Sequence, residues 1–429
     1  MTSRNRRTAA LLAAGALAGS LALAGLTSAG ATSATAGPRG PGHGHGHGPG
    51  HGHGAREAVR FATFNASLNR AAEGGLSADL ASGDDEQIRN AAETVQRTRP
   101  DVLLVNEFDF VAGGGAADDF RENYLEVPQR GARPIRYPYA YVAPVNTGVP
   151  SGHDLNNDGT VGGPDDAFGF GTFPGQYGML VLSRHPVDRS RVRTFREFLW
   201  ADMPGALLPE DPATGEPWFT DAELADVRLS SKSHWDVPIR VGRRTVHFLV
   251  SHPTPPTFDG AEDRNGRRNH DEIRFWADYV ASGKRARYVY DDRGRRGGLP
   301  RGAAYVIAGD QNADPYDGDS VPGAARQLLT APRVIDPRPA SRGAVEASRT
   351  QSGNADQEGP ARLDTADFAD PVPGNLRVDY VLPSRPLRVR DAGVFWPVAA
   401  DPLSRLTGTF PFPTSDHRLV WVDVTVPGR

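Results

Sequence analysis

An acidic and an amide side chain, Asp310 and Asn312, stand two positions apart directly after a short apolar run at residues 305–308. The run is typical of a buried strand, and Gly309 is typical of a strand end. Side chains at i and i+2 of an extended segment point to the same side, so both could face one small polar substrate. The alternative is an Asx turn, in which Asp310 bonds to the backbone two residues further on.

Six more polar residues fall at the ends of other short apolar runs or within them: Asn65, Glu107, His252, Asp379, Asp416 and His417. Glu107 and Asp416 offer anionic oxygens that suit Mg²⁺ or Mn²⁺, and Asn65 offers a neutral oxygen. We therefore predict a metal site at these three residues. For Glu107 alone, an ordinary solvated strand end would be the simpler explanation.

The other residues of this set suit acid–base chemistry at phosphorus. Asp379 could fix the tautomer and the charge of His417. Asp310 could orient or deprotonate a water molecule, while Asn312 and His252 could bind phosphate oxygens. Together with a metal ion, these groups suit the attack of water on a phosphoester. For His252 alone, a satisfied and partly buried histidine is the alternative.

Apolar runs predict the strands that would carry these residues: 59–65, 101–107, 177–184, 191–195, 234–241, 244–251, 305–308, 376–382 and 419–426. Helical spacing predicts one helix that is capped by Asp84 and ends at Arg99, and a second helix at 271–279. Strand, helix and strand in this order favour packed α/β layers. Residues 340–375 are polar and contain proline and glycine, so we expect a long ordered loop or a partly mobile lid there.

A glycine-rich loop carries a second set of oxygen ligands at the spacing of a calcium loop. Counted from Asp154 as position 1, positions 1, 3, 5, 7 and 12 are Asp154, Asn156, Asp158, Thr160 and Asp165. Gly159 stands at position 6, where the loop must turn sharply. No flanking helices are evident, so we expect a structural Ca²⁺ loop, not a paired EF-hand. An acidic turn-rich loop without an ion is the alternative.

Residues 284–301 combine seven Lys and Arg residues with Tyr288 and Tyr290. Basic side chains interleaved with aromatic rings are what a single-stranded nucleic-acid groove uses. Glycine and aspartate are mixed into the same segment, which favours a solvated hairpin loop. Nucleic acid is therefore kept as an alternative substrate.

The first 36 residues have the order of a secretory signal: Arg4, Arg6 and Arg7, an Ala/Leu-rich run at 8–26, and small residues up to Ala36. A transmembrane anchor is the alternative, and residues 5–8 form a weak twin-arginine pattern. Residues 37–56 form a Gly/Pro tract rich in histidine. We interpret this tract as a flexible linker, with metal scavenging as the alternative. We expect a secreted protein that has no membrane anchor once the signal is cleaved.

The composition limits the remaining chemistry. The 429 residues include no cysteine, so disulfides, thiolate catalysis and Cys-ligated zinc are excluded. Cleavage after residue 36 would remove three arginines and no acid from a chain of net charge −4, which leaves −7. The total charge therefore does not indicate a strongly basic nucleic-acid-binding surface. We find no internal repeat and no second globular domain, and we expect a monomer.

Seven motifs occur in one order along the chain: Phe64-Asn65, Val105-Asn106-Glu107, residues 177–186, Ser251-His252, Gly309-Asp310-Gln311-Asn312, Val378-Asp379-Tyr380 and Ser415-Asp416-His417. In these motifs and their order, the chain resembles the endonuclease/exonuclease/phosphatase superfamily. The resemblance spans residues 59–426 and implies a catalytic domain at 57–429. It implies an α/β fold, a four-layer α/β sandwich in which two packed mixed β-sheets are flanked by helices. It also implies one Mg²⁺-dependent site at one end of the sandwich.

The resemblance also implies which residues bind the metal. Glu107 is similar to the family's principal metal ligand, Asn65 is similar to its neighbour or to a second ligand, and Asp416 would lie near the metal. Two features depart from the family pattern: Gln311 replaces an apolar residue, and Ser-His-Pro at 251–253 replaces the more frequent Asn-x-His-Leu. Both departures affect the expected surroundings of His252, and neither affects the expected reaction class.

For catalysis, the resemblance implies that Asp310 positions the water or protonates the leaving group. Asn312 and His252 would hold the phosphoryl group, and Asp379 would orient His417. The calcium-like loop and the His/Gly tract lie outside the shared pattern.

The acidic, exported chain with this set of residues predicts a secreted Mg²⁺-dependent phosphoesterase that hydrolyses phosphomonoesters or small phosphodiesters. An extracellular nuclease that cleaves DNA or RNA is the alternative enzyme. A phospholipid or sphingomyelin diesterase is less favoured, since no exposed amphipathic or aromatic membrane hairpin is evident. An inactive binding module that keeps the fold is least favoured, because all the motif carboxylates are present.

Overall fold

The computed structural model describes residues 58–427 of the chain. The predicted signal sequence at 1–36 and the predicted linker at 37–56 lie outside the described residues. None of the helices between residues 58 and 427 combines the length and the apolar character that a membrane-crossing helix needs.

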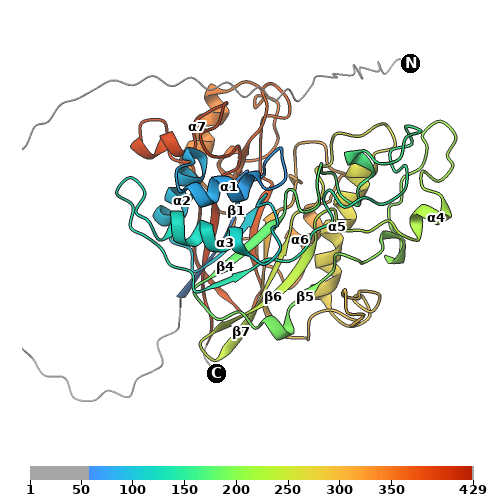
Figure 1. The fold of residues 1–429 in the computed structure, drawn as a ribbon, viewed down its shortest axis with the longest axis horizontal. Coiled ribbons are helices and arrows are strands. Elements are labelled where there is room, and N and C mark those ends of the chain that lie inside the picture. Colours follow the sequence, from blue (N-terminus) through green and yellow to red (C-terminus); the bar gives the residue numbers. More distant parts are fainter. Residues whose placement is uncertain (1–57, 428–429) are drawn as a thin grey trace, which may run out of the picture. The chain divides into compact units, whose positions relative to one another are not determined.

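A six-stranded mixed sheet forms one half of a sandwich (Figure 1). Its strands, in spatial order, are β12 (Arg388–Val394), β13 (Val420–Thr425), β1 (Ala58–Asn65), β2 (Val102–Asn106), β4 (Met179–Ser183) and β3 (Tyr139–Tyr141). β1 and β2 are parallel, and the other neighbours are antiparallel. Because β1 and β2 run in the same direction, their last residues, Asn65 and Asn106, lie side by side at one end of the sheet.

A five-stranded mixed sheet forms the other half. Its strands, in spatial order, are β11 (Asp379–Pro383), β8 (Ala304–Asp310), β7 (Arg244–Ser251), β6 (His234–Val241) and β5 (Arg193–Thr194). β7 and β8 are parallel, so the residues that follow these strands also lie at one end. A separate two-stranded ribbon pairs β9 (Ala366–Asp367) with β10 (Asn375–Leu376).

The two sheets pack face to face through an apolar core. The rings of Phe61 and Phe248, one from each sheet, are 5.5 Å apart, and Tyr141 meets Trp235 edge-on at 5.2 Å. The central strands bury both faces, which explains why their sequences read as nearly continuous apolar runs. Burial of these side chains is the main favourable contribution to folding.

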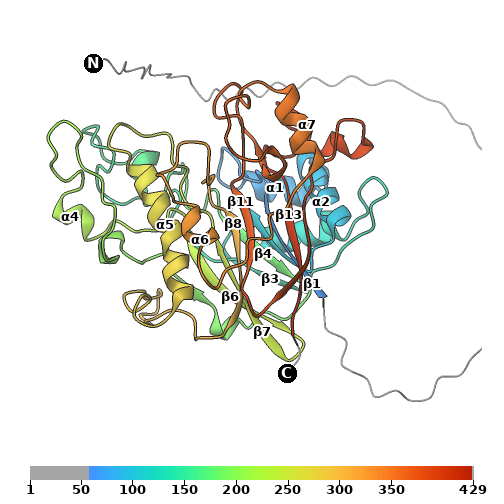
Figure 2. The same cartoon turned by 180° about the vertical axis from the view of Figure 1, so that it is seen from behind.

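Helices cover the outer face of each sheet, as Figure 1 and the reverse view in Figure 2 show. The six-stranded sheet packs against α1 (Gly75–Ser82), α2 (Glu86–Thr98), α3 (Gly115–Asp119) and a π-helical turn at Phe120–Leu125. The five-stranded sheet packs against α5 (Arg264–Ala281) and α6 (Arg326–Leu329). The other helices are α4 (Asp221–Leu224), α7 (Arg342–Thr350) and 3₁₀ turns at Pro164–Asp166, Arg189–Arg191, Trp200–Asp202, Ala361–Leu363 and Pro402–Leu406. The predicted α/β sandwich with two mixed sheets and flanking helices is confirmed.

Helix α2 begins one residue later than the sequence predicted. Its cap is Asp85, whose carboxylate accepts a hydrogen bond from the backbone N–H of Ile88 at 2.8 Å. The predicted cap, Asp84, instead forms an ion pair with Arg89 on the surface. Both acids precede the same apolar helix face, so the sequence pattern does not separate them.

Three further segments differ from the prediction. Helix α5 begins at Arg264, before the predicted start at residue 271. The segment at 340–375 is not a plain loop, because Ser341 caps α7 through the N–H of Ala344 at 3.1 Å. Leu376, the first residue of the predicted strand at 376–382, instead belongs to β10 and pairs with β9, and β11 begins at Asp379.

Gly309 allows β8 to pass close to the backbone of β7. Its φ is +145°, and a Cβ placed on it would lie 2.0 Å from the carbonyl oxygen of Ser251. We expect Gly309→Ala to lower the free energy of unfolding by on the order of 2 kcal/mol, because the backbone must move to relieve the clash. Urea unfolding followed by circular dichroism would measure the change.

Gly115→Ala is the matched control, since nothing lies within 4 Å of a Cβ placed at that position. This variant should unfold at the same urea concentration as the unmodified protein, or a slightly higher one. An equal loss of stability in both variants would contradict the close approach of the two strands.

Candidate active site

The two parallel strand pairs end at the same end of the sandwich, and the polar residues that follow them converge there. The side-chain nitrogen of Asn65, at the end of β1, donates to Oδ2 of Asp310, at the end of β8, over 3.1 Å. The side-chain oxygen of Asn106, at the end of β2, accepts the backbone N–H of Asp310 at 3.3 Å. These bonds join the two sheets at the predicted site.

The amide of Asn65 holds two carboxylates. Its nitrogen donates to Oε1 of Glu107 at 3.0 Å as well as to Asp310, and its oxygen accepts the backbone N–H of Ser67 at 3.2 Å. The side chain is fully buried. In this arrangement Asn65 positions the carboxylates, and its role as a metal ligand stays a prediction.

Glu107 occupies a strained backbone position directly after β2. Its φ is +59°, a left-handed conformation that is unfavourable for residues with a Cβ. Its Oε2 accepts a hydrogen bond from the side chain of Asn69 at 2.8 Å. Burial raises the pKa of Glu107, and the charge of Asp416 raises it further. The hydrogen bond from Asn65 lowers this pKa but does not outweigh burial. The charges of Glu107 and Asp416 therefore interact unfavourably at this side of the site.

Asp310 lies buried between two imidazoles. Its Oδ2 is 3.4 Å from Nε2 of His252 and 3.6 Å from Nε2 of His417. Its Oδ1 accepts the backbone N–H of Asn312 at 2.8 Å, which is the hydrogen bond of an Asx turn. Asp310 therefore forms the turn with one oxygen and faces the two imidazoles with the other. Burial opposes ionisation, but the charge of His417 and the hydrogen bond from His252 hold the pKa of Asp310 well below its usual range.

His417 and Asp379 lie in contact, as the sequence predicted. Nδ1 of His417 donates to Oδ2 of Asp379 at 2.9 Å, and the strand register places Asp379 directly opposite Asp310. Burial lowers the pKa of His417, but the charges of Asp379 and Asp310 outweigh it and raise this pKa well above its usual value. Burial raises the pKa of Asp379 to about 6, although the positive charge of His417 acts to lower it. The three groups share one buried proton, which resides mainly on His417.

His252 and Asn312 follow the ends of β7 and β8. Burial and the charge of Lys232 lower the pKa of His252 to about 4, so its imidazole is neutral at neutral pH. Among the described residues, Nδ1 of His252 has no hydrogen-bond partner. The amide of Asn312 donates to the carbonyl oxygen of Pro253 at 3.1 Å. Both side chains reach the site, and their contacts with phosphate oxygens stay predictions.

Two groups at this site have the chemistry to hold a metal ion. Within residues 58–427, one set of three acidic or histidine side chains has ligand atoms within 4.8 Å of one another: Asp310, Asp379 and His417. A protonated histidine has no free lone pair for a metal, so we attribute this set to the shared proton. Glu107 and Asp416 fit a divalent cation better, because both offer hard oxygen donors. Their like charges interact unfavourably, and a bound cation would offset this repulsion.

Sequence reasoning missed four side chains that build this site: Asn69, Asn106, Lys232 and Thr365. The Thr365 hydroxyl accepts the backbone N–H of Asp379 at 2.9 Å and so fixes the start of β11. Lys232 could have been noticed, because the chain uses lysine only twice. Asn69 and Thr365 carry no comparable signal, since they follow no apolar run.

The predicted calcium loop forms a tight acidic turn. The Asp154 carboxylate accepts the backbone N–H groups of Asp158 and Gly159 at 3.1 and 2.8 Å. At the last ligand position Asp165 is exposed, and the buried carboxylate is that of Asp166. Such bonds occur in turns with and without an ion, so calcium binding stays a prediction.

The basic segment at 284–301 packs against the protein. The hydroxyls of Tyr288 and Tyr290 donate to carboxylates at 3.0 and 2.6 Å, and both rings contact Phe198. The segment leads into the start of β8, whereas Asp310 ends that strand. The rings are therefore engaged within the protein, at the far end of β8 from the candidate site.

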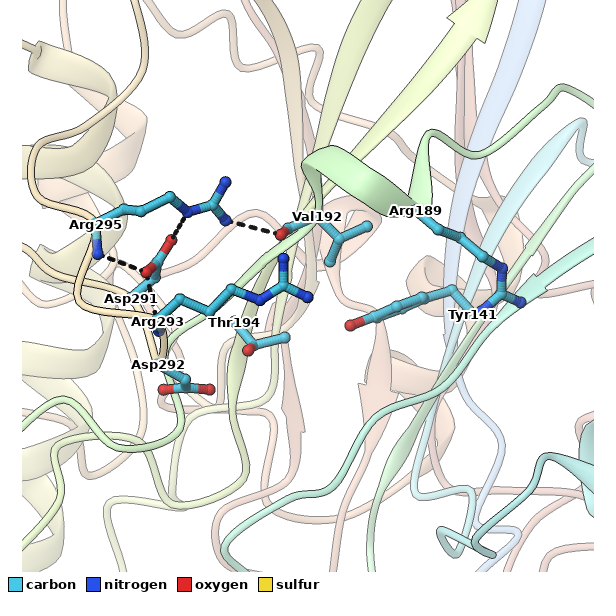
Figure 3. A pocket seen from close by; sticks show the side chains of 8 residues that line it. All are labelled: Tyr141, Arg189, Val192, Thr194, Asp291, Asp292, Arg293 and Arg295. Carbon is cyan, nitrogen blue, oxygen red and sulfur yellow. Dashed lines mark hydrogen bonds and ion pairs between the residues drawn. The ribbon is translucent and has the colours of Figure 1, made fainter.

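A polar pocket of about 190 Å³ lies beside this segment (Figure 3). Tyr141 and Arg189 line one side of it, and the other side is lined by Asp291, Asp292, Arg293 and Arg295. Within it, Nε of Arg295 donates to the Asp291 carboxylate at 2.7 Å. The pocket shares no lining residue with the candidate active site and is separate from it.

Comparisons with known proteins give a family match that covers most of the chain. The sequence model described as the Endonuclease/Exonuclease/phosphatase family matches residues 62–417. The chain is similar to the crystal structure of an endonuclease/exonuclease/phosphatase from Beutenbergia cavernae DSM 12333, at 18% identity, with 87% of this chain and 72% of that chain covered and a TM-score of 0.46.

Two further solved structures are similar at lower scores. Sphingomyelinase C from Streptomyces griseocarneus has 17% identity, with 86% of this chain and 99% of that chain covered and a TM-score of 0.43. Truncated Caenorhabditis elegans TDP2 has 15% identity, with 86% of this chain and 97% of that chain covered and a TM-score of 0.39. Among curated proteins, no sequence matches the chain.

We expect Mg²⁺ to stabilise the folded protein through Glu107 and Asp416. A ligand that binds only the folded state adds about 2.7 kcal/mol at a hundredfold excess over its dissociation constant. After EDTA treatment, MgCl₂ should therefore raise the melting temperature in differential scanning fluorimetry. Glu107→Gln should lose most of this rise, because it removes one of the two carboxylates.

Asp154→Asn is the matched control, since it removes a carboxylate from the predicted calcium loop and leaves the candidate site intact. It should keep the Mg²⁺-dependent rise. A rise that persists in Glu107→Gln and disappears in Asp154→Asn would put the stabilising ion in the loop and contradict the assignment. The same variants titrated with CaCl₂ would test the calcium loop.

Proposed function

Because the chain belongs to the endonuclease/exonuclease/phosphatase family, we propose that it is a secreted, Mg²⁺-dependent enzyme that hydrolyses phosphomonoesters or small phosphodiesters. Membership of this family makes it a hydrolase that acts on phosphoric ester bonds. One observation carries the proposal: the ionised Asp310 lies buried between His252 and His417 and is held by Asn65.

Asp310 is suited to orient the attacking water or to accept its proton. Its pKa lies well below the usual range, so the carboxylate is ionised at neutral pH and can act as a hydrogen-bond acceptor. Hydrogen bonds from Asn65 and Asn312 hold its two oxygens in place. A fixed acceptor reduces the loss of entropy when water and substrate are brought together.

His417 is suited to stabilise negative charge on the phosphoryl group. Its imidazolium is buried, and Asp379 keeps it protonated and oriented through Nδ1. The other nitrogen, Nε2, faces the site beside Asp310. A fixed cation in a partly desolvated site interacts strongly with charge that develops during the reaction.

Glu107 and Asp416 are the residues that would hold the divalent cation. Such a cation supplies positive charge beside the phosphoryl oxygens when it is bound. Oxygen donors of this type suit Mg²⁺, and also Mn²⁺. Asn65 and Asn69 orient Glu107 through both of its carboxylate oxygens.

Two features favour small esters over nucleic acid. The chain is acidic overall, with a net charge of −4, and the basic segment at 284–301 leads into the start of β8 and not toward its Asp310 end. Phosphate-backbone binding depends on clustered Lys and Arg side chains. The signal-like order of residues 1–36 supports the proposed location outside the cell.

A phospholipid or sphingomyelin diesterase is a second candidate, which one structural feature favours. Three large apolar side chains are strongly exposed on loops: Phe258 at 83%, Val372 at 78% and Phe410 at 86%. Phe258 follows His252 in the chain, and Phe410 precedes His417. Exposed apolar side chains near a site can enter the interface of a lipid surface. The sequence had suggested no such membrane-facing feature.

We expect Asp310→Asn to lower hydrolysis by on the order of 10²- to 10⁴-fold, because the amide cannot accept a proton. The assay would compare p-nitrophenyl phosphate, bis-p-nitrophenyl phosphate and plasmid DNA after EDTA treatment and after MgCl₂ is restored. Asp319→Asn, an exposed carboxylate after the same strand, is the control and should keep full activity. Full activity of Asp310→Asn would reject the mechanism, and rapid plasmid cleavage with weak ester turnover would favour a nuclease.

The lipid candidate predicts that the protein binds vesicles of phosphatidylcholine and sphingomyelin through its exposed phenylalanines. The double variant Phe258→Ser, Phe410→Ser should then sediment with vesicles less than the unmodified protein does. Val161→Ser, which alters an apolar side chain that is 60% exposed in the calcium-like loop, is the control. Equal sedimentation of all three proteins would count against a lipid substrate.

A further inference from the structure

Lysine occurs only at positions 232 and 284, although the chain contains 48 Lys and Arg residues. Lys284 is exposed on the segment after α5. Lys232 is only 6% exposed and lies on the short loop before β6, next to Ser231, whose hydroxyl donates to the carbonyl oxygen of His252 at 3.5 Å. Lysines are almost never buried without a partner, so this position calls for an explanation.

Hydrogen bonds with helix α5 hold the loop that carries Lys232. The Glu272 carboxylate accepts the backbone N–H of Ser231 at 2.7 Å and that of Thr254 at 2.7 Å. Arg268 donates to a carbonyl oxygen of the same loop at 2.8 Å. These bonds tie the loop to the segment that follows His252, so the backbone of Lys232 is fixed beside the site.

The Lys232 ammonium interacts electrostatically with the charged groups of the site. Burial lowers the pKa of Lys232. The negative charges of Glu272, Glu107 and Asp310 raise this pKa, but burial outweighs them. Its own charge in turn lowers the pKa of His252. Within residues 58–427 no hydrogen bond or ion pair of its ammonium is found, and this nitrogen is not among the polar atoms sealed from solvent. Its N–H donors therefore remain available to a substrate.

We propose that Lys232 binds a non-bridging oxygen of the substrate phosphate and favours dianionic phosphomonoesters over monoanionic diesters. The inference rests on the proposed function and narrows its substrate class. A phosphomonoester carries about −1.5 to −2 charges at pH 7, whereas a diester carries one negative charge per phosphate. The ammonium supplies a positive charge in addition to that of His417, and the dianion gains more from it.

A lysine suits this position better than an arginine does. An ammonium is a compact charge on a flexible stem, and it can reach one oxygen from a buried backbone position. A guanidinium is a planar fork that needs more room and more acceptors. Lys232 could instead serve as a counter-ion for Glu272 and Glu107 alone. That structural role would affect the fold and every substrate alike, which makes the two roles separable.

The first experiment compares Lys232→Met with Lys284→Met, the other lysine of the chain. In Lys232→Met, kcat/KM for p-nitrophenyl phosphate should fall by on the order of 10²-fold, and that for bis-p-nitrophenyl phosphate by tenfold or less. Lys284→Met should change neither value. Equal losses for both esters in Lys232→Met, or no loss, would overturn the inference. If the unmodified protein hydrolyses neither ester with Mg²⁺, the proposed function itself fails.

A second measurement depends neither on activity nor on a variant of Lys232. Protein labelled with ¹³C at the lysine ε-carbon gives two side-chain signals, which Lys284→Met assigns. Titration with inorganic phosphate in the presence of MgCl₂ should shift the Lys232 signal to saturation and leave that of Lys284 in place. A Lys232 signal that does not move, or that moves no more than the Lys284 signal, would overturn phosphate binding at Lys232.

Discussion

The hydrogen bond between Asn65 and Asp310 is the interaction on which the site depends, because it joins the ends of two different sheets. The same amide nitrogen also holds Glu107, so one donor group places two carboxylates relative to each other. Carboxylates at this separation repel, and burial strengthens the repulsion. A buried donor at Asn65 offsets part of that cost without adding charge. His252 and His417 both lie against the carboxylate that this bond holds.

The rest of the site is a balance of buried charge. Asp310 and Asp379 flank a protonated His417, while the charges of Glu107 and Asp310 raise the pKa of Lys232 against its burial. Left-handed backbone at Glu107 and Asn312 adds strain at the same place. Such a cluster contributes little to stability, and the apolar core between the sheets must supply it. Function is thus concentrated at one end of the sandwich, while the packed strands beneath it keep the fold.

The parts of this site that could be predicted from the sequence are those that follow an apolar strand. Asn65, Glu107, His252 and Asp310 each come directly after such a run, so both their existence and their common location could be inferred. Asp379 and His417 were paired on different grounds, since a carboxylate can fix the tautomer and charge of a histidine, and the structure confirms their contact. The prediction failed where a pattern was shared or weak: Asp84 and Asp85 compete for one cap, and α7 lies in a segment that reads as a loop.

The sequence by itself determined the strands that carry the site, the polar residues beside them, the absence of thiol chemistry and the family resemblance, whereas β3 and β12 at two edges of the six-stranded sheet were not predicted. The predicted features follow from periodicity and local composition, which act within a few residues of the chain. Only the tertiary structure decided which groups meet. Asn65 and Asp310 are 245 residues apart in the chain, and Lys232 enters the site because α5 holds its loop there. Contacts of this kind depend on how two sheets and a helix pack together, and no local pattern encodes them.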